Sequence, residues 1–290
     1  MYQVSLKSGG TALLYPIFAV VTWGTNIVAG RFLVYNHGVS GIALSYLRFL
    51  LATPILLLLT MTALNRPIRV SLKDIPMLAL GGFLGVALFN VMLYTSLEHI
   101  TASTTAFLAS MSSPITYILL VLAGAERLKV KPLSGVFFSI IGLYFLLSNG
   151  LGIHDIIGVL YALIAAIAWS GYTILVKVLS TRYDPLYILL WSMVTGTLIL
   201  TPISINEKLV YSEPVIIALI LYIAMVPGAL GYLTWNIGVK KAGPTKSAVF
   251  IPCVPLVAAS LGLVLLGEPL STVQFIGGIL IVIGIFLVIK

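Results

Sequence analysis

Polar and aromatic side chains interrupt several long apolar runs, at spacings that place them on shared helix faces. Residues three or four apart lie on one face of a helix, as Trp23 does with Asn26 and Asn90 with Tyr94. The whole set is Trp23, Asn26, Asn90, Tyr94, Trp169, Tyr172, Tyr232, Trp235 and Asn236. Together these groups predict a pocket that binds a small amphipathic solute through hydrogen bonds and ring contacts. For any one of them, an interhelical hydrogen bond is an equal alternative.

Arg48 is a basic residue deep inside a predicted apolar helix. About eight helical residues precede it, which is roughly 12 Å at 1.5 Å per residue. A cation buried in this way is costly and normally faces a cavity or a partner. One hypothesis is therefore an anchor for a substrate carboxylate or another anion. The alternative is a packing arginine that bonds helix carbonyls or Glu98.

Pro114, Pro252 and Pro255 are three of the prolines that lie within the apolar runs. Proline removes a backbone hydrogen bond from a helix interior. These positions therefore predict kinked or locally unwound helices that act as gating hinges. Plain curvature for packing is the alternative.

Glu126 and Glu268 each precede an apolar run, and we predict that they are structural residues that brace a helix junction. Ser271 with Gln274 has the spacing of a capping box, and Pro132 suits the first turn of a helix. Coupling to an ion is the alternative role of the glutamates. Because the remaining acids fall near the ends of the apolar runs, the sequence favours neutral, zwitterionic or anionic cargo over cationic drugs.

Motifs for catalysis and metal binding are missing from the sequence. His37, His99 and His154 are scattered without a His-Glu-x-x-His spacing, and no Walker loop appears. The single cysteine, Cys253, excludes an intramolecular disulfide. We therefore predict no enzyme activity, no metal and no cofactor.

The elements that position these residues must be membrane helices. The sequence is 60% hydrophobic and only 8% charged, with a mean hydropathy of +1.15, whereas soluble domains carry about 25% charged residues. A membrane crossing needs roughly 20 mainly apolar residues. Ten such runs are found, at 11–34, 40–63, 74–97, 102–124, 132–149, 155–179, 185–205, 214–239, 245–266 and 271–289. We predict an all-α polytopic membrane protein with ten transmembrane helices.

Lys and Arg gather on alternate connections between these runs, and this asymmetry indicates orientation. One side holds most of the 16 basic residues, among them Lys7, Arg66, Arg127, Lys177 and Lys290. We predict that this side is cytoplasmic and carries both termini of a multi-pass plasma-membrane protein. The formal charge of +8 is then a topology signal rather than a sign of nucleic-acid binding.

One sequence pattern occurs twice, at an offset of 142 residues. An acid is followed by two glycines seven residues apart within an apolar run. The matched pairs are Glu126 with Glu268, Gly135 with Gly277, and Gly142 with Gly284. Trp23 and Trp169 are 146 residues apart, and so are Arg31 and Lys177.

This pattern predicts two repeats, 1–149 and 150–290, with five helices each. Because five is odd, the second copy must enter the membrane from the opposite side, so the repeats are inverted. Inverted repeats place a substrate site near the midplane, between the halves. The arrangement is typical of transporters.

Seven short motifs connect the chain to a known family. They are Trp23-Gly24-Thr25-Asn26, Leu47-Arg48-Phe49, Tyr94-Thr95-Ser96-Leu97, Ser113-Pro114, Glu126-Arg127-Leu128, Val254-Pro255 and Gly267-Glu268-Pro269-Leu270. Over nearly its whole length the chain resembles the EamA type of the drug/metabolite transporter superfamily. The resemblance implies ten helices in two inverted repeats and a central cavity lined mainly by helices 1, 3, 4, 6, 8 and 9. It also implies export or exchange of amino acids and other small metabolites.

We therefore expect a secondary transporter that exports small metabolites, such as amino acids, by alternating access around a central cavity. The alternatives are a flippase for an amphipathic lipid-linked substrate and a non-transporting membrane receptor or assembly factor. The expected partners are a small-molecule substrate and the lipid bilayer, with no nucleic acid. A monomer is compatible with the sequence.

Overall fold

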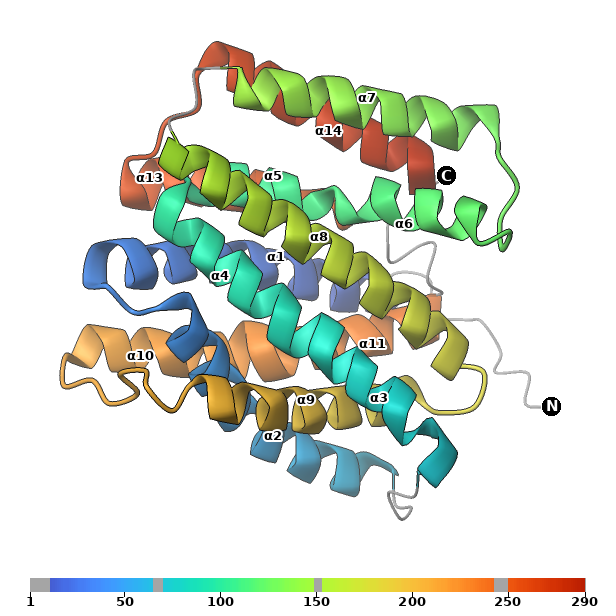
Figure 1. Ribbon diagram of the computed structural model, residues 1–290, viewed down its shortest axis with the longest axis vertical. Coiled ribbons are helices and arrows are strands. Elements are labelled where there is room, and N and C mark those ends of the chain that lie inside the picture. The colour runs from blue at the N-terminus through green and yellow to red at the C-terminus, as the bar shows by residue number, and fades with distance from the viewer. Residues whose placement is uncertain (1–10, 65–69, 149–152, 243–249, 290) are drawn as a thin grey trace.

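The computed structural model describes residues 11–64, 70–148, 153–242 and 250–289, and within these ranges every regular element is a helix (Figure 1). The first half contains α1 (Thr11–Arg31), η1 (Phe32–Asn36), α2 (Gly41–Leu64), η2 (Leu72–Asp74), α3 (Ile75–Gly82), η3 (Phe83–Leu88), α4 (Phe89–His99), α5 (Ala102–Ser110), α6 (Ser112–Leu122) and α7 (Val130–Leu147). The second half contains α8 (Ile153–Leu179), α9 (Pro185–Ile203), α10 (Pro214–Ile223), η4 (Ala224–Leu230), α11 (Gly231–Ala242), α13 (Cys253–Leu266) and α14 (Thr272–Ile289).

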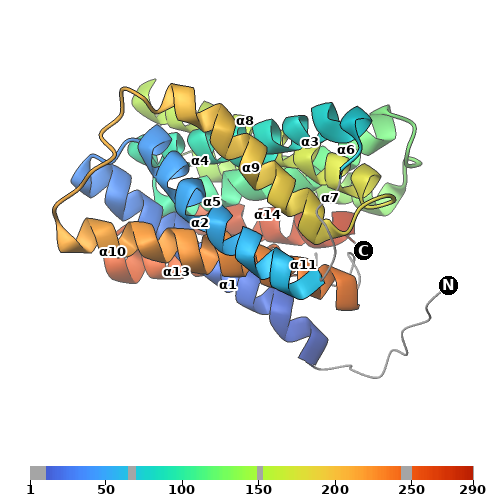
Figure 2. The same cartoon turned by 90° about the horizontal axis from the view of Figure 1, so that it is seen from below.

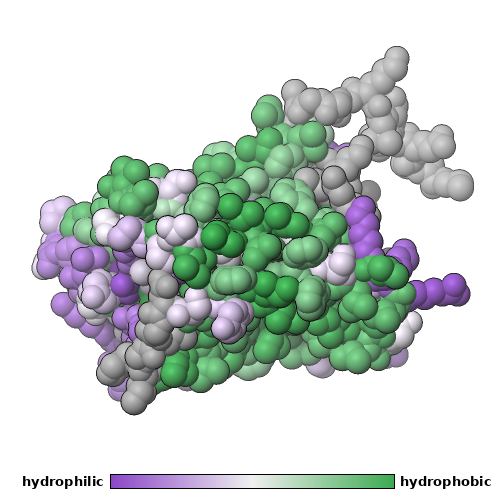
Figure 3. All heavy atoms as spheres, turned by 90° about the horizontal axis from the view of Figure 1, so that it is seen from above, coloured by the Kyte–Doolittle hydropathy of each residue, from purple (hydrophilic) through white to green (hydrophobic). Residues whose placement is uncertain are grey.

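Consecutive helices join into long apolar spans that match the predicted runs. Within the described residues, nine helical stretches are long and apolar enough to cross a membrane, and Cys253–Leu266 is a shorter apolar helix. The start of the predicted run 245–266 lies outside the described residues. Figure 3 shows a wide hydrophobic band between two hydrophilic ends. The prediction of an all-α, multi-pass membrane protein is confirmed.

Helices of the two halves interlock around the centre of the bundle. α1 packs against α11 and α13, and α4 packs against α8. α1 begins and α14 ends on the same side of the bundle (Figures 1 and 2). The centre is therefore bounded by helices from both halves rather than by one half alone.

α7 and α14 run antiparallel and touch through their glycines. A Cβ built at Gly142 would lie 2.6 Å from the Gly277 carbonyl oxygen, and one at Gly135 would lie 2.5 Å from that of Gly284. Since the repeat matches Gly135 with Gly277 and Gly142 with Gly284, exchanging the copies turns one contact into the other. The division into two inverted repeats stays a prediction, which this antiparallel contact supports.

The third span of each half contains a π-helical segment, η3 between α3 and α4 and η4 between α10 and α11. Segments of this kind are rare and frequently occur at functional sites. Asn90 Nδ2 donates to the carbonyl oxygens of Gly85 (3.2 Å) and Val86 (2.9 Å) in η3. Arg48 Nη2 donates to the carbonyl oxygen of Pro227 (3.4 Å) in η4. Polar side chains thus bind carbonyl groups in both π segments.

The predicted proline breaks lie where helices start. Pro114 is the third residue of α6, which a single residue, Met111, separates from α5. Pro252 is the N-cap residue of α13, and Pro255 is its third residue. A proline ring clashes with the carbonyl group four residues before it, so the break before Pro114 has a local cause. The role of these prolines as gating hinges stays a prediction.

The turn before α14 forms as the sequence predicts. Gly267 ends α13 with φ at 64°, a left-handed conformation that glycine adopts without steric cost. Gln274 N donates to Ser271 Oγ (3.2 Å), and Ser271 N donates to Gln274 Oε1 (3.0 Å), which confirms the capping box. Pro132 likewise lies in the first turn of α7.

We predict that Gly142→Ala destabilises the protein although alanine is a better helix former than glycine. The new Cβ would lie 2.6 Å from the Gly277 carbonyl oxygen and 2.7 Å from Ile281 N, so α7 and α14 would have to separate. Overpacking of this kind typically costs about 1–3 kcal/mol. Thermal unfolding of purified protein in detergent should show a lower Tm.

Gly262→Ala is the matched control, because a Cβ at this helical glycine would meet no other group closer than 3.5 Å. Its Tm should equal or exceed that of the wild type. Equal Tm values for the two variants would contradict the close contact between α7 and α14.

Candidate functional site

A cavity of about 680 Å³ lies at the centre of the bundle, between the two halves. All six spans that the family resemblance implies contribute lining residues, and α2 adds Arg48. A cavity of this volume falls in the range of small-molecule sites. The centre of the protein is therefore large enough to hold a metabolite.

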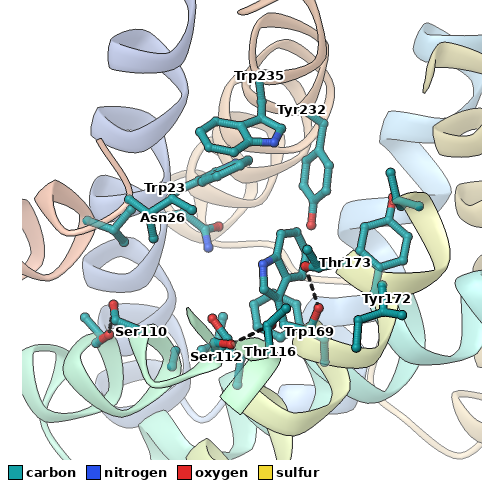
Figure 4. A pocket seen from close by; sticks show the side chains of 18 of the residues that line it. Trp23, Asn26, Ser110, Ser112, Thr116, Trp169, Tyr172, Thr173, Tyr232 and Trp235 are labelled. Atoms are coloured by element: carbon teal, nitrogen blue, oxygen red, sulfur yellow. Dashed lines mark hydrogen bonds between the residues drawn. The ribbon is translucent and has the colours of Figure 1, made fainter. Parts of the chain in front are cut away.

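Aromatic rings from both halves form one wall of the cavity (Figure 4). The Trp23 ring lies 5.2 Å from Trp235, 5.6 Å from Tyr232 and 6.2 Å from Trp169, measured between centroids. Trp169 in turn lies 4.7 Å from Phe89. Several of these pairs are tilted or edge-to-face, the geometries that aromatic rings prefer. Such a wall provides flat apolar faces for an apolar or aromatic part of a ligand.

Short polar side chains also line the cavity, largely on α5, α6 and α8 (Figure 4). The hydroxyls of Ser110, Thr116 and Thr173 each donate to a carbonyl four residues earlier in their own helix. Since a hydroxyl oxygen also accepts hydrogen bonds, these groups can still accept from a ligand. Asp and Glu are absent from the described lining, whereas Arg48 and Lys177 both belong to it. The ionisable part of the lining is therefore cationic.

Arg48 is the centre of a polar network beside the cavity, and only 2% of this residue is exposed. Nη1 donates to Asn90 Oδ1 (2.8 Å) and to the Tyr94 hydroxyl (2.9 Å). The Tyr94 hydroxyl donates to Asn26 Oδ1 at 2.7 Å. Nη2 reaches the Pro227 carbonyl oxygen, and Nε has no hydrogen-bond partner among the described residues.

All partners of Arg48 among the described residues are neutral. Glu98, the acid that the packing hypothesis named, accepts instead from the backbone N–H of Gly41 (2.8 Å). The predicted bonding to a helix carbonyl does occur, at Pro227. Arg48 therefore combines a packing role with a positive charge that no described carboxylate neutralises.

The structure brings most of the predicted site residues together. Those that line the cavity are Trp23, Asn26, Arg48, Trp169, Tyr172, Tyr232 and Trp235. Asn90 and Tyr94 lie behind Arg48 and position it, outside the lining. Asn236 belongs to α11, but its side chain is not among those that the structure describes.

Other lining residues were missed by the sequence analysis. Phe89 lies 146 residues before Trp235, which is one of the two offsets of the repeat. This match to a predicted site residue was the signal that could have identified Phe89. The hydroxyls of Ser112, Thr116 and Thr173 give no such signal, because serine and threonine also occur in the packing of membrane helices. The prolines Pro114, Pro252 and Pro255 lie outside the lining, although Ile251 and Val254 belong to it.

Glu126 and Glu268 lie at opposite ends of the bundle. Gly158, near the start of α8, faces His99, and Lys177 lies roughly 28 Å further along that helix at 1.5 Å per residue. Lys177 Nζ lies 3.7 Å from Glu126 Oε1 at this far end. We call it the Glu126 end, and we call the end with Arg31, Leu97, Ala102 and Glu268 the Glu268 end.

Each glutamate forms an ion pair with a base of the other half, and the predicted role of both in bracing their own turns stays a prediction. Glu268 Oε1 accepts from Arg31 Nε (2.7 Å), and its Oε2 accepts from the Ala102 N–H (2.9 Å) at the start of α5. The lining of the cavity extends to Leu120 and Lys177 at the Glu126 end, but includes no residue of the Glu268 contact. The cavity is therefore closed at the Glu268 end and open at the Glu126 end.

A metal centre is not indicated by the arrangement of ligating side chains. Within the ranges that the structure describes, no three His, Cys, Asp or Glu residues are close enough to hold an ion. The chemistry that the cavity offers is hydrogen bonding, ring contact and a positive charge.

Known proteins resemble this chain in both sequence and fold. An uncharacterized transporter of Bacillus subtilis, YetK, is 28% identical over 98% of this chain and 87% of its own length. A probable terminal-alkyne amino-acid exporter of Streptantibioticus cattleyicolor is 25% identical over 94% and 91%. A probable amino-acid metabolite efflux pump of Escherichia coli is 27% identical over 98% and 95%. A protein crystal structure shares the fold, with a TM-score of 0.69 over 97% of this chain and 96% of its own, at 17% identity.

The family comparison covers nearly the whole chain. The model of the EamA-like transporter family matches twice, over residues 10–148 and 156–290. The two matches fall on the two halves whose helices enclose the cavity. The chain belongs to the EamA-like transporter family.

Proposed function

We propose that this transporter exports small metabolites, amino acids or their relatives, by alternating access across the plasma membrane. Membership of the family makes the chain a multi-pass transporter of small molecules in a lipid bilayer. The observation that carries the finer proposal is the central cavity, which both halves line and which is open at only one end. Relatives named as amino-acid exporters and efflux pumps support amino-acid cargo and outward transport.

The lining favours a solute with an apolar body and a carboxylate. The rings of Trp23, Trp169 and Trp235 offer apolar faces, and the charge of Arg48 attracts an anion. An ammonium group can be held by hydroxyl oxygens or against the face of an indole ring. A zwitterionic amino acid with a large side chain meets all of these conditions.

Alternating access requires a bundle with two related arrangements. The antiparallel α7 and α14, with their interchangeable glycine contacts, support a pseudo-two-fold relation between the halves. The basic residues at the Glu126 end, such as Arg127 and Lys177, support a cytoplasmic position of this end under the positive-inside rule. The open mouth then faces the compartment from which an exporter collects its cargo.

The cavity also bears on the alternatives. A receptor or assembly factor without transport activity predicts a centre too tightly packed to hold a solute, in contrast to the 680 Å³ found. A lipid flippase predicts movement of lipid-linked substrates rather than of free solutes, and a transport assay separates these two cases.

We predict that the purified protein binds and moves large neutral amino acids. Three of its four tryptophans line the cavity, while Trp191 packs in a separate cluster with Leu78 and Ile188. Binding should therefore change the tryptophan emission of the wild type and of Trp191→Phe alike. In Trp169→Phe the emission change should shrink and the affinity should fall.

The transport measurement uses proteoliposomes loaded with labelled amino acids, with protein-free vesicles as the control. Release should be faster with protein and slower with Trp169→Phe than with Trp191→Phe. A panel of amino acids that produces neither release nor an emission change would make the proposal wrong. Movement of lipid-linked probes alone would establish the flippase alternative.

We predict that Arg48→Gln weakens binding of carboxylate solutes about tenfold or more. A hydrogen bond to a charged group contributes about 1.5–3 kcal/mol, and 1.4 kcal/mol corresponds to a factor of ten. The matched ligand is the amide of the same amino acid, which lacks the negative charge and should bind both proteins with similar Kd. Arg182→Gln, on the exposed surface, is the control variant.

The ratio of the two Kd values within one protein is the deciding quantity, because it does not depend on the overall stability of the variant. A wild type that binds the acid and the amide equally well refutes the anchor. So does a variant in which both ligands weaken by the same factor, since Arg48 would then act through packing.

A further inference from the structure

Among the ion pairs that join the halves of the chain, two are related by the repeat, and each takes its acid from one half and its base from the other. Arg31 of the first half meets Glu268 of the second, and Lys177 of the second half meets Glu126 of the first. The acids are 142 residues apart and the bases are 146 residues apart, which are the two offsets of the repeat. Exchanging the copies therefore converts one ion pair into the other.

The two pairs differ in distance and exposure. Arg31 Nε lies 2.7 Å from Glu268 Oε1, and the two side chains are 7% and 14% exposed. Lys177 Nζ lies 3.7 Å from Glu126 Oε1, and these side chains are 64% and 41% exposed. Equivalent sequence positions thus form a tight, buried contact at one end of the bundle and a loose, exposed contact at the other.

The tight pair closes the bundle at the Glu268 end. Arg31 also donates to the carbonyl oxygen of Leu97 at the end of α4, and Glu268 accepts from the backbone of Ala102 at the start of α5. One cluster therefore holds α1, α4, α5 and the turn between α13 and α14 together. The lining of the cavity stops before all four residues.

The loose pair lies at the open mouth. Lys177 belongs to the lining, together with Leu120 near the end of α6 and Ser180 directly after α8. The state of each ion pair thus matches the state of the cavity at its own end. Where the pair is tight the cavity is closed, and where it is loose the cavity is open.

We propose that the two ion pairs are the gates of the transporter, and that they close in alternation. This inference rests on the proposed transport function. In the opposite state Glu126 and Lys177 form the tight pair, Arg31 and Glu268 separate, and the cavity opens at the Glu268 end. Ion pairs suit this task because water replaces their partners on separation, so the two arrangements can lie close in free energy.

Thiol labelling reports which end of the cavity is open. Ser103→Cys and Ser180→Cys serve as reporters, each introduced together with Cys253→Ser to remove the native thiol. Ser103 is 1% exposed and lies beside the Glu268 contact, whereas Ser180 lies at the open mouth. The rate of reaction with a membrane-impermeant maleimide is measured on purified protein in detergent.

In Arg31→Gln the rate at position 103 should rise tenfold or more, and the rate at position 180 should fall. The reason is that a buried carboxylate without its partner is unfavourable, so the state in which Glu268 is exposed becomes the favoured one. The exchanged pair Arg31→Glu with Glu268→Arg should restore slow labelling at 103. Arg182→Gln, which breaks the pair of an exposed arginine with Asp74 outside the cavity lining and leaves Asp74 its hydrogen bond from Tyr183, should change neither rate.

Lys177→Arg tests the same gate from an exposed position, where folding does not depend on the substituted side chain. It gives the loose pair the base that the tight pair uses, and arginine binds carboxylates through a planar fork of donors. The rate at position 103 should rise several-fold, and the rate at 180 should fall.

Two results would overturn the gates. One is an unchanged rate at position 103 in both Arg31→Gln and Lys177→Arg. The other is an Arg31→Gln variant in which the labelling rates at positions 103 and 180 both rise and the Tm falls. That result would mean that the tight pair merely holds the bundle together. Since labelling needs no cargo, a protein that transports nothing refutes the proposed function without deciding the labelling result.

Discussion

A charge within a membrane-spanning bundle must be satisfied by the protein itself, and Arg48 is where this constraint acts on the fold. Its guanidinium donates to Asn90 and Tyr94 on α4 and to the carbonyl oxygen of Pro227 in η4. The Tyr94 hydroxyl in turn donates to Asn26 of α1. Each bond from a charged donor contributes about 1.5–3 kcal/mol. One side chain thus ties both halves together at the centre, while its neutral partners leave the positive charge uncompensated beside the cavity. The group that stabilises the centre is thus also the one that we propose as the anchor for a carboxylate.

Irregular helical segments concentrate around this centre. η3 and η4 replace α-helical turns in the third span of each half, and Met111 separates α5 from α6. Gly85 of η3 leaves room for the ring of Tyr172, which would lie 2.5 Å from an added Cβ and which lines the cavity. Regular apolar helices would pack the centre solid, so these departures both make room for a solute and provide places where the bundle can change shape.

The sequence predicts the helices well, because apolar runs of membrane length have few other structures available to them. It also finds seven cavity residues, since a polar or aromatic group inside an apolar run must face something other than lipid. Phe89 was missed because an isolated phenylalanine in such a run looks like any lipid-facing or packing residue. The pairing of Arg31 with Glu268 was missed for another reason, which is that 237 residues separate the partners and only the packed helices bring them together. Arg48 lines the cavity, whereas Tyr94 positions Arg48 from outside the lining. The sequence does not separate these two roles, because they depend on tertiary contacts alone.

A repeated fold carries two equivalent arrangements, and the side chains decide which one the protein prefers. Arg31 has a planar fork that bonds Glu268 and Leu97 at once, and its guanidinium lies 3.6 Å above the Tyr35 ring. Lysine is a compact, strongly hydrated charge that loses more on burial, and Lys177 stays in solvent. If the two ion pairs act as the gates that we propose, arginine at one end and lysine at the other bias the bundle toward closure at the Glu268 end. An exporter gains from this inequality, since a resting state open toward the cytoplasm is ready to load cargo, and a bound solute then needs to shift only a modest difference in free energy.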